Sequence, residues 1–314
     1  MKTIFLGTPE FAIPSLEALI KTPWISILAV CTQTDKPAHR GKHLTEPPVK
    51  KLAQEKDIEI IQTKRISKEK EVIEKLKSLK PDLFVSSSYG QILSQEFLDI
   101  APVINVHASL LPKYRGAAPI NWVILNGEKE TGISIMKTEL DIDSGPIILQ
   151  AKHKIGENET SVELYKNLSL LGAETLIKAL ELISNSKVTY TPQNHSKSTH
   201  APMLKKEMGL INWNKTSFEI HNQIRGLQPW PSAFTHYKGK MIKIWESRDV
   251  ACNVSTNNKQ NISSGTITEI SDYIKVKTKD GFIDIYKLQP ENKKIISAKD
   301  FINGARLEIG NKFE

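Results

Sequence analysis

Asn105 and His107 are the residues whose types and spacing most directly suggest chemistry. They stand two positions apart in the run VINVHA at 103–108, so in an extended strand both side chains point to the same face. A polar group buried among valines and isoleucines costs about 1–3 kcal/mol unless it finds a hydrogen-bond partner. A buried histidine is usually a satisfied core residue, but this pair ends a strand and a loop with proline and glycine follows it. We therefore expect the pair to border a ligand-binding crevice.

A second polar cluster follows at 138–147, where TELDIDSGPI carries Glu139, Asp141 and Asp143. Acidic loops are usually solvated turns, but a carboxylate beside a histidine fixes the tautomer of the imidazole and favours its charged form. Asparagine, histidine and aspartate together can stabilise a developing oxyanion and move protons, as acyl transfer requires. The sequence has no serine or cysteine in a nucleophile-elbow pattern. We therefore expect an acyl group to pass directly to an amine, without an acyl-enzyme.

Two other kinds of site are disfavoured. The eight histidines form no His-x-His or His-Glu-x-x-His pattern, so we expect no metal site. Gly7-Thr8-Pro9 stands after the first expected strand, where a dinucleotide-binding protein has G-x-G-x-x-G. A single glycine there favours a tight strand-to-helix turn capped by Thr8.

The elements that position these residues alternate between strand-like and helix-like runs over the first 150 residues. That alternation predicts an α/β fold with a doubly wound, mostly parallel sheet and helices on both faces. Such sheets bind ligands at the carboxyl ends of their strands, so we expect the loops after Gly7, 86–89 and His107 to collect the chemistry. The expected strands are 3–7, 25–33, 58–62, 82–88 and 103–108, with a strand pair at 145–155, and the expected helices are 11–20, 48–55, 67–79, 93–100 and 161–184.

The composition changes after the last of these helices. Residues 186–205 are polar, contain two prolines and have no sustained periodicity, which predicts a linker. Short strand-like runs follow, and Lys-Asp-Gly at 279–281 predicts a hairpin between two of them. We therefore expect a catalytic domain at 1–189, a linker at 190–206, and a small antiparallel, OB-like β-barrel domain at 207–314.

Overall composition is that of a globular protein, with 314 residues of which 39% are hydrophobic and 25% charged. No apolar run approaches the roughly 18–20 residues of a membrane-spanning helix. Two cysteines without a Cys-x-x-Cys pattern suit a reducing compartment. We therefore expect a cytoplasmic protein that does not enter the membrane. We also expect it to act as a monomer, an expectation on which the composition has no bearing. The formal net charge of +8 weakly favours an anionic partner such as nucleic acid.

Three longer motifs resemble those of one enzyme family. They are N-V-H-x-S-L-L-P-x-Y-R-G-A-A-P-I at 105–120, L-D-x-D-S-G-P-I at 140–147 and F-x-G-T-P-E-F-A at 5–12. The chain resembles the 10-formyltetrahydrofolate-dependent formyltransferases over essentially its whole length, including Q-P-W-P at 228–231. Within that family it is most similar to the members that formylate initiator methionyl-tRNA for translation initiation. The resemblance thus implies 10-formyltetrahydrofolate as co-substrate and a tRNA as partner.

The resemblance also implies roles for individual residues. Asn105, His107 and Asp143 correspond to the catalytic residues, and Asp141 is the second candidate if the Ser-Gly-Pro alignment that selects Asp143 is wrong. The residues expected to line the folate site are Ser109, Leu110, Leu111, Pro112, Tyr89, Gly90, Gln91, Ile92 and Leu93. A basic loop at 35–50 resembles the one that enters the tRNA acceptor stem. The residues expected to contact tRNA are Arg40, Lys42, Lys50, Lys51 and Arg225.

Three alternatives stay open at this point. The same catalytic residues would serve a hydrolase that releases formate from the folate, with water as the nucleophile. A formyltransferase that acts on a sugar-nucleotide amine shares the core motifs. A nucleic-acid-binding module with a silent sheet domain is the most distant alternative, and the joint presence of Asn105, His107 and Asp143 disfavours it.

Overall fold

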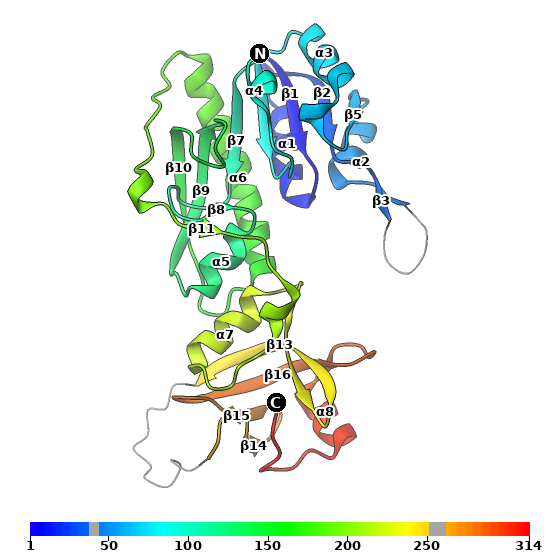
Figure 1. Cartoon of the computed structure of the whole chain (residues 1–314), viewed down its shortest axis with the longest axis vertical. Coiled ribbons are helices and arrows are strands. Elements are labelled where there is room, and N and C mark those ends of the chain that lie inside the picture. Colours follow the sequence, from blue (N-terminus) through cyan, green and yellow to red (C-terminus); the bar gives the residue numbers. More distant parts are fainter. Residues whose placement is uncertain (38–43, 251–261) are drawn as a thin grey trace. The chain divides into compact units, whose positions relative to one another are not determined.

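Two units make up the chain in a computed structural model, which describes residues 1–37, 44–250 and 262–314 (Figure 1). Unit 1 consists of Met1–Pro119, Glu130–Lys154 and Tyr165–Pro202, and unit 2 consists of Ile120–Lys129, Ile155–Leu164 and Met203–Glu314. None of the helices in the described ranges has the length and apolar character needed to traverse a lipid bilayer.

Unit 1 is built on a seven-stranded mixed sheet with the strand order β10-β9-β7-β6-β1-β2-β5. Neighbouring strands are parallel from β5 to β7, whereas β9 and β10 extend one edge in antiparallel fashion. The strands are β1 (Lys2–Gly7), β2 (Ser26–Thr32), β5 (Ile60–Gln62), β6 (Leu83–Ser87), β7 (Val103–His107), β9 (Glu130–Lys137) and β10 (Ile147–Lys154). The parallel strands confirm the sequence prediction.

The edge of the sheet differs from the prediction. At 145–155, where the sequence suggests a strand pair, there is one strand, β10, and its partner is β9. The six central residues of β9 are buried on both faces, so its sequence lacks the apolar–polar alternation that marks a half-exposed strand. This burial is why β9 is not recognisable from its pattern.

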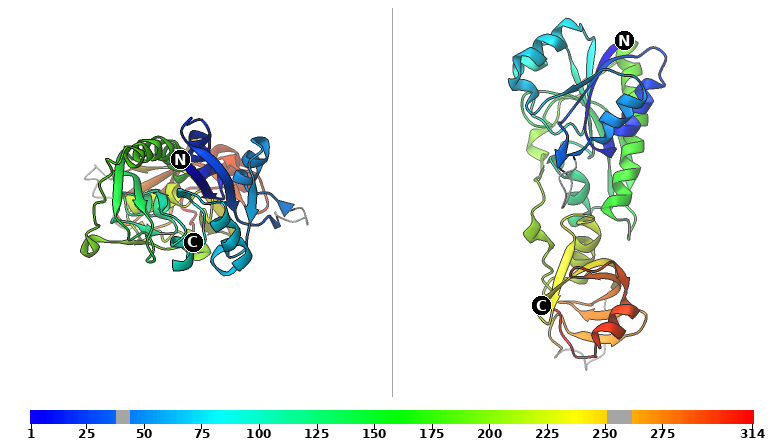
Figure 2. Two further views of the ribbon diagram at one scale, coloured as in Figure 1. Left: turned by 90° about the horizontal axis from the view of Figure 1, so that it is seen from above. Right: turned by 90° about the vertical axis from the view of Figure 1, so that its right-hand side faces the viewer.

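Helices cover both faces of the sheet (Figure 2). On one face lie α1 (Ile13–Ile20), α2 (Pro48–Glu55) and the unit 1 part of α6 (Ser161–Ser184). There Phe11, in the short helix η1 (Glu10–Ala12), packs edge-on against Tyr165. On the other face lie α3 (Lys70–Ser78) and α4 (Gln95–Leu98), and Phe97 of α4 packs on Phe84 with ring centroids 4.7 Å apart. Helices on both faces confirm the doubly wound arrangement.

The central strand β1 lies between β2 and β6, and its carboxyl end is the point at which the strand order reverses. The loops that leave these strands are tied together there. Thr8 Oγ1 donates to the carbonyl of Tyr89 at 3.1 Å, and Gln33 Nε2 donates to the same carbonyl at 2.9 Å. The predicted helix cap at Thr8 is therefore wrong, because this hydroxyl bonds across the sheet edge and η1 begins after Pro9 without a side-chain cap.

The polar segment 186–202 lies in unit 1. Its residues His200–Ala201 form β11, which pairs in parallel with β8 (Arg115–Gly116) in the loop after β7. Earlier in the segment, Thr191 exchanges two backbone hydrogen bonds with Ile147 of β10. Backbone hydrogen bonds hold this segment on unit 1. Because it does not bury a continuous apolar face, its sequence has no apolar periodicity. The other short elements are β3 (Lys36–Pro37), β4 (Leu44–Thr45), η2 (Ile66–Lys68), η3 (His195–Lys197) and η4 (Lys206–Gly209).

Unit 2 contains an antiparallel sheet with the order β12-β13-β16-β15-β14, and β17 pairs with β16. Its strands are β12 (Ala233–Tyr237), β13 (Lys240–Val250), β14 (Ile267–Ile270), β15 (Ile274–Lys277), β16 (Phe282–Pro290) and β17 (Ile296–Ser297). Strands β15 and β16 form the hairpin predicted at 279–281. Among the described residues no ladder joins β12 to β14, so these strands do not close on one another as a barrel would. Both edge strands are instead bonded to the C-terminal segment, because His236 of β12 exchanges two backbone hydrogen bonds with Glu314, and Ile267 of β14 bonds to Gly310 and Asn311.

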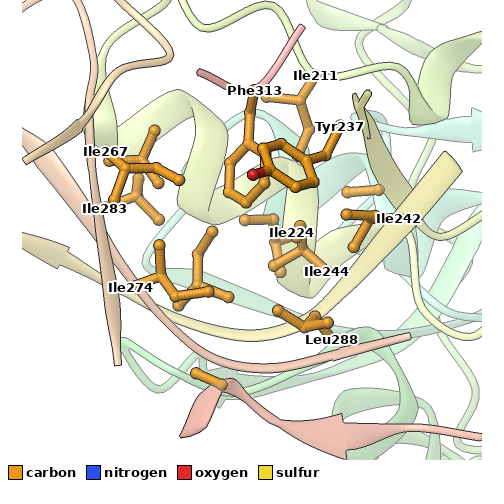
Figure 3. Close-up of a cluster of buried hydrophobic side chains, with 14 of the residues drawn as sticks. Ile211, Ile224, Tyr237, Ile242, Ile244, Ile267, Ile274, Ile283, Leu288 and Phe313 are labelled. Atoms are coloured by element: carbon orange, nitrogen blue, oxygen red, sulfur yellow. The ribbon is translucent and has the colours of Figure 1, made fainter. Parts of the chain in front are cut away.

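The core of unit 2 is rich in isoleucine (Figure 3). Phe313, next to the last residue of the chain, is fully buried in it, and its ring packs against Trp213 and Tyr237. Helix α7 (Ser217–Gly226) contributes Ile220 and Ile224 to the same core and begins with a capping box at Thr216. The other helices are α8 (Ala298–Ala305) and α5 (Pro119–Leu125), which joins unit 2 from Ile120 onward.

Candidate active site

Asn105 and His107 lie at the carboxyl end of β7, where neighbouring strands β6 and β9 also border them. By strand alternation their side chains are on the same face as Val103, which belongs to the core under α3 and α4. His107 is 6% exposed, and Asn105 is half-buried. The side-chain amide of Asn105 makes no hydrogen bond within the described part of the chain. Its two N–H donors are therefore available to a ligand.

The imidazole of His107 stands between two oxygen acceptors. Its Nε2 is 2.9 Å from the carbonyl oxygen of Tyr114, and its Nδ1 is 3.5 Å from Oδ2 of Asp143. Because a carbonyl only accepts hydrogen bonds, Nε2 carries the proton in the bond to Tyr114, while Nδ1 faces the carboxylate of Asp143. A neighbouring carboxylate is a suitable partner for a positively charged imidazole. The surroundings of His107 thus suit a group that stabilises negative charge.

Asp143 reaches His107 from the loop between β9 and β10. Its backbone has a φ of +50°, in the left-handed region that few non-glycine residues adopt. Its Oδ2 also accepts a hydrogen bond from the backbone N–H of Gly116 at 2.9 Å. Two residues later, a Cβ on Gly145 would lie 2.0 Å from the carbonyl oxygen of Lys137. Only glycine permits the close approach of this loop to β9.

The second acidic candidate in this loop, Asp141, is placed differently. Asp141 is exposed, and its backbone carbonyl accepts a hydrogen bond from the hydroxyl of Ser144 at 3.0 Å. No ion pair or hydrogen bond joins its carboxylate to another described residue. Of the two aspartates, the structure therefore brings Asp143 to His107.

Ser109, Leu110, Leu111 and Pro112 form the start of the loop after β7. The Ser109 hydroxyl donates to the carbonyl four residues ahead at 2.7 Å, and the N–H of Leu111 donates to Ser134 Oγ at 3.0 Å. Ser109 and Leu111 are buried, whereas Leu110 and Pro112 are half-buried. Ser109 and Leu111 therefore anchor the loop, and Leu110 and Pro112 retain surface that a ligand could contact.

The segment 89–93 follows β6 at the same sheet edge. Tyr89 is buried, and burial raises the pKa of its hydroxyl well above the ordinary value. The side chain of Gln91 is occupied, because it accepts from the N–H of Ile66 and donates to the carbonyl of Thr63. Gly90 and Ile92 are exposed, and Leu93 is half-buried. Gln91 thus anchors the segment, while Gly90, Ile92 and Leu93 keep accessible surface.

The basic residues expected at a tRNA surface fall into different environments. Arg40 and Lys42 lie outside the described residues. Lys50 is bonded to Asp35 at 2.7 Å and to Glu46 at 2.8 Å, and these two hydrogen bonds raise the pKa of its ammonium group. Lys51 is exposed, and no ion pair joins its ammonium group to another described residue. Of the two lysines, only Lys51 presents an uncompensated charge.

Arg225 is part of the interior of unit 2. It is 5% exposed, and burial lowers the pKa of its guanidinium below the ordinary value. The guanidinium donates to Asn222 Oδ1 at 2.9 Å and to the carbonyls of Gly156 and Glu159 at 3.2 and 2.8 Å. This geometry speaks against a direct contact between Arg225 and a tRNA phosphate.

Two residues that sequence reasoning does not single out bond to His107 or to the loop that carries Asp143. Tyr114 supplies the carbonyl at Nε2, and Gln193 is buried with its side chain bonded to the Asp143 loop. The local signal for Tyr114 is its place in the Y-R-G-A-A-P run, but a polar segment with two prolines carries no signal for a buried glutamine. Within the described ranges, no three histidine, cysteine, aspartate or glutamate side chains are grouped so that they could hold a metal ion.

Comparison with known proteins assigns both units to one family. Residues 1–180 match the family described as formyl transferase, and residues 203–306 match formyl transferase, C-terminal domain. The chain is 44% identical to the methionyl-tRNA formyltransferase of Ruminiclostridium cellulolyticum and 43% identical to that of Clostridioides difficile, with 99% of each chain covered in both comparisons. Among solved structures it is similar to the sugar 3N-formyl transferase WlaRD, with a TM-score of 0.68 and 26% identity over 94% of this chain and 99% of that one.

Proposed function

This chain belongs to the formyl transferase family, and within it to the methionyl-tRNA formyltransferases, and we propose that it transfers a formyl group from 10-formyltetrahydrofolate to the α-amino group of methionine on initiator tRNA. The observation that carries the proposal is the imidazole of His107, held between two acceptors beside the unbonded amide of Asn105. We further propose that the reaction takes place in the cytoplasm, uses no metal ion and is carried out by a monomer.

Catalysis rests on stabilising charge at the formyl oxygen. The amine attacks the formyl carbon, and the carbonyl oxygen becomes an oxyanion. We assign the Asn105 amide and the His107 imidazolium as its stabilising groups, and Asp143 as the carboxylate that keeps the imidazolium charged and oriented. Losing one such donor typically lowers the rate about 100–1,000-fold.

The intermediate collapses when its bond to N10 of the folate breaks. The new bond is the amide between the formyl carbon and the methionine nitrogen, and the proton lost by the amine is taken up by N10. We propose that a water held by Asp143 or His107 relays this proton. Tetrahydrofolate and formylmethionyl-tRNA leave, so atoms and charges balance without any external oxidant or reductant.

The surroundings of Cys31 support direct transfer. This thiol is buried in the core of unit 1, and burial raises its pKa to about 12. A thiol with such a pKa is almost never ionised near neutral pH and is a poor nucleophile. Cys252 lies outside the described residues. Asn105, His107 and Asp143 are not themselves nucleophiles in this scheme.

The folate site is proposed at the loops after β6 and β7. Within it, Leu110, Pro112, Gly90, Ile92 and Leu93 have accessible surface, and Ser109, Leu111, Tyr89 and Gln91 act by holding the two loops in place. The crystal structure of WlaRD was determined in the presence of 5-N-formyl-THF. A formyl-folate co-substrate here is consistent with that likeness and with family membership.

The tRNA contacts are proposed on the basic loop and on the C-terminal domain. Arg40, Lys42 and Lys51 are the residues that we assign to phosphate contacts, with Lys50 and Arg225 as supports of the local structure. We propose 1–189 as the catalytic domain, 190–206 as its connection and 207–314 as an OB-like tRNA-binding domain. Phosphate contacts of this kind make affinity fall steeply with salt.

The test is transfer of labelled formyl from 10-formyltetrahydrofolate to charged initiator tRNA, with elongator methionyl-tRNA as the control. We expect efficient transfer to the initiator and little to the elongator. Formate release that is equal with and without aminoacyl-tRNA would instead identify a hydrolase. Transfer to a sugar-nucleotide amine at a higher kcat/KM than to the tRNA would also contradict the proposal.

A further inference from the structure

Gln193 uses its whole hydrogen-bonding capacity around the Asp143 loop. It is 7% exposed. Its Nε2 donates to the carbonyl of Asp143 at 2.9 Å and to that of Gly145 at 2.7 Å. Its Oε1 accepts from Nε and Nη2 of Arg115 at 3.2 and 2.7 Å. Two donors and one acceptor oxygen are thus all engaged, and the orientation of this amide is determined by its partners.

These bonds close a ring around the catalytic carboxylate. Gly116, the neighbour of Arg115, donates its backbone N–H to Oδ2 of Asp143. Gln193 therefore links the backbone of Asp143 to the same short strand, β8, that holds the carboxylate of Asp143. The left-handed backbone of Asp143 costs free energy, and it persists only where surrounding contacts determine it. Gln193 supplies two of those contacts.

Thr199, which lies in the same segment as Gln193, bonds to Tyr114, whose carbonyl is the other oxygen partner of the His107 imidazole. Thr199 Oγ1 accepts from the N–H of Tyr114 at 2.9 Å, and the carbonyl of Thr199 accepts from the N–H of Arg115 at 2.9 Å. Tyr114 also has a positive φ, +62°, and its carbonyl faces Nε2 of His107. Both oxygen partners of His107 are thus held by the segment 191–201.

We propose that the segment 191–201 positions the His107 imidazole for formyl transfer, with Gln193 holding Asp143 and Thr199 holding Tyr114. The inference rests on the proposed function for the identity of the reaction. Neither Gln193 nor Thr199 is assigned a contact with the reacting atoms, so both are positioning residues. Their effect on the rate must pass through Asp143 and Tyr114.

The first test is Gln193→Glu. Glutamate keeps the length of the side chain and an acceptor for Arg115, but it replaces two donors with an oxygen that faces two carbonyls. A displacement of about 1 Å at a catalytic group costs on the order of 100-fold. We expect kcat to fall by about that factor while KM for the folate changes little. Lys197→Gln, an exposed change in the same segment, is the control and should leave both parameters unchanged.

A double-mutant cycle separates positioning from general damage. Because Gln193 acts through Asp143, Gln193→Glu should cause little further loss in an Asp143→Ala background. Two losses that multiply would overturn the proposal, since they would mean that Gln193 acts elsewhere. If Gln193→Glu does not fold, as judged by thermal melting, the Thr199 variants decide the question.

Thr199 provides a rescue pair. Thr199→Val removes the hydroxyl that accepts from Tyr114 and should lower kcat, whereas Thr199→Ser retains the hydroxyl and should restore it. Equal kcat values for the two variants would contradict the positioning role. The activity of the wild-type enzyme shows which hypothesis is wrong. If the proposed function is wrong, the wild type does not formylate methionyl-tRNA; if only the positioning role is wrong, the wild type is active and the two Thr199 variants have equal kcat values.

Discussion

Asp143→Asn is the substitution that most sharply tests how the site works. The carboxylate lies 3.5 Å from Nδ1 of His107, and the two side chains are 16% and 6% exposed. At an effective dielectric constant of about 20, unit charges at this distance attract by roughly 5 kcal/mol. Residual water and relaxation of the protein screen part of that attraction. If the substitution raises the activation free energy by about half of the attraction, the rate falls by a factor of about 100. Asparagine keeps an oxygen for the N–H of Gly116, so the change removes charge while preserving size.

The assay is single-turnover formyl transfer to charged initiator tRNA at saturating 10-formyltetrahydrofolate. We expect Asp143→Asn to lower this rate about 100-fold and, in separate steady-state assays, to leave KM for both substrates nearly unchanged. Asp141→Asn is the matched control, because it makes the same chemical change two residues away at an exposed side chain. A rate for Asp143→Asn within about threefold of wild type would refute an electrostatic role of this size. A large loss in Asp141→Asn alone would transfer the role to that residue.

Three further predictions concern stability and tRNA affinity. Phe313→Ala removes a fully buried ring from unit 2 and should lower its free energy of unfolding by about 3–5 kcal/mol in denaturant titrations, whereas Ile309→Ala, at a residue that is 66% exposed, should change it little. Burial lowers the pKa of His221 below its ordinary value of 6.5. Just below pH 6.5 the imidazole is therefore more fully protonated in the unfolded chain than in the folded chain. Stability should therefore fall as the pH drops below that value, by up to about 1.4 kcal/mol per pH unit, and His221→Gln should remove this slope in melting curves. Lys51→Ala should reduce the slope of log KM for aminoacyl-tRNA against log salt by about 1, and an unchanged slope would exclude Lys51 from the phosphate contacts.

The placement of Asn105 and His107 could be predicted because polar residues two positions apart in an apolar strand lie on the same face of the sheet. Their strand, its parallel neighbours and the helices on both faces follow from runs of apolar residues that the structure buries. From the sequence, Asp143 is preferred to Asp141 only by aligning the Ser-Gly-Pro run with the family motif. Spacing within a loop does not determine which of the two carboxylates points toward His107. In the structure that choice depends on the left-handed backbone of Asp143 and on the close packing of Gly145 against β9.

The parts that sequence reasoning missed are held by backbone groups remote in the chain. Gln193 bonds to carbonyls about 50 residues away, and no local pattern marks a glutamine for such a partner. Arg225 illustrates the same limit, because an arginine near a helix end is usually solvated, whereas this one is buried against carbonyls more than 60 residues earlier. Polar side chains that satisfy backbone groups leave no periodicity in the sequence, so only the folded arrangement reveals them.

Rapid-quench analysis of a single turnover distinguishes direct attack by the amine from every route through the protein. Enzyme, formyl-labelled 10-formyltetrahydrofolate and charged initiator tRNA are mixed, and the label on folate, protein and tRNA is followed through the reaction. Direct attack predicts that label lost from the folate appears on methionyl-tRNA at the same rate, with none on the protein at any time, and that Asn105→Ala slows this single step. Label that passes through the protein, or that leaves the folate as formate while the tRNA stays unlabelled, would contradict direct transfer.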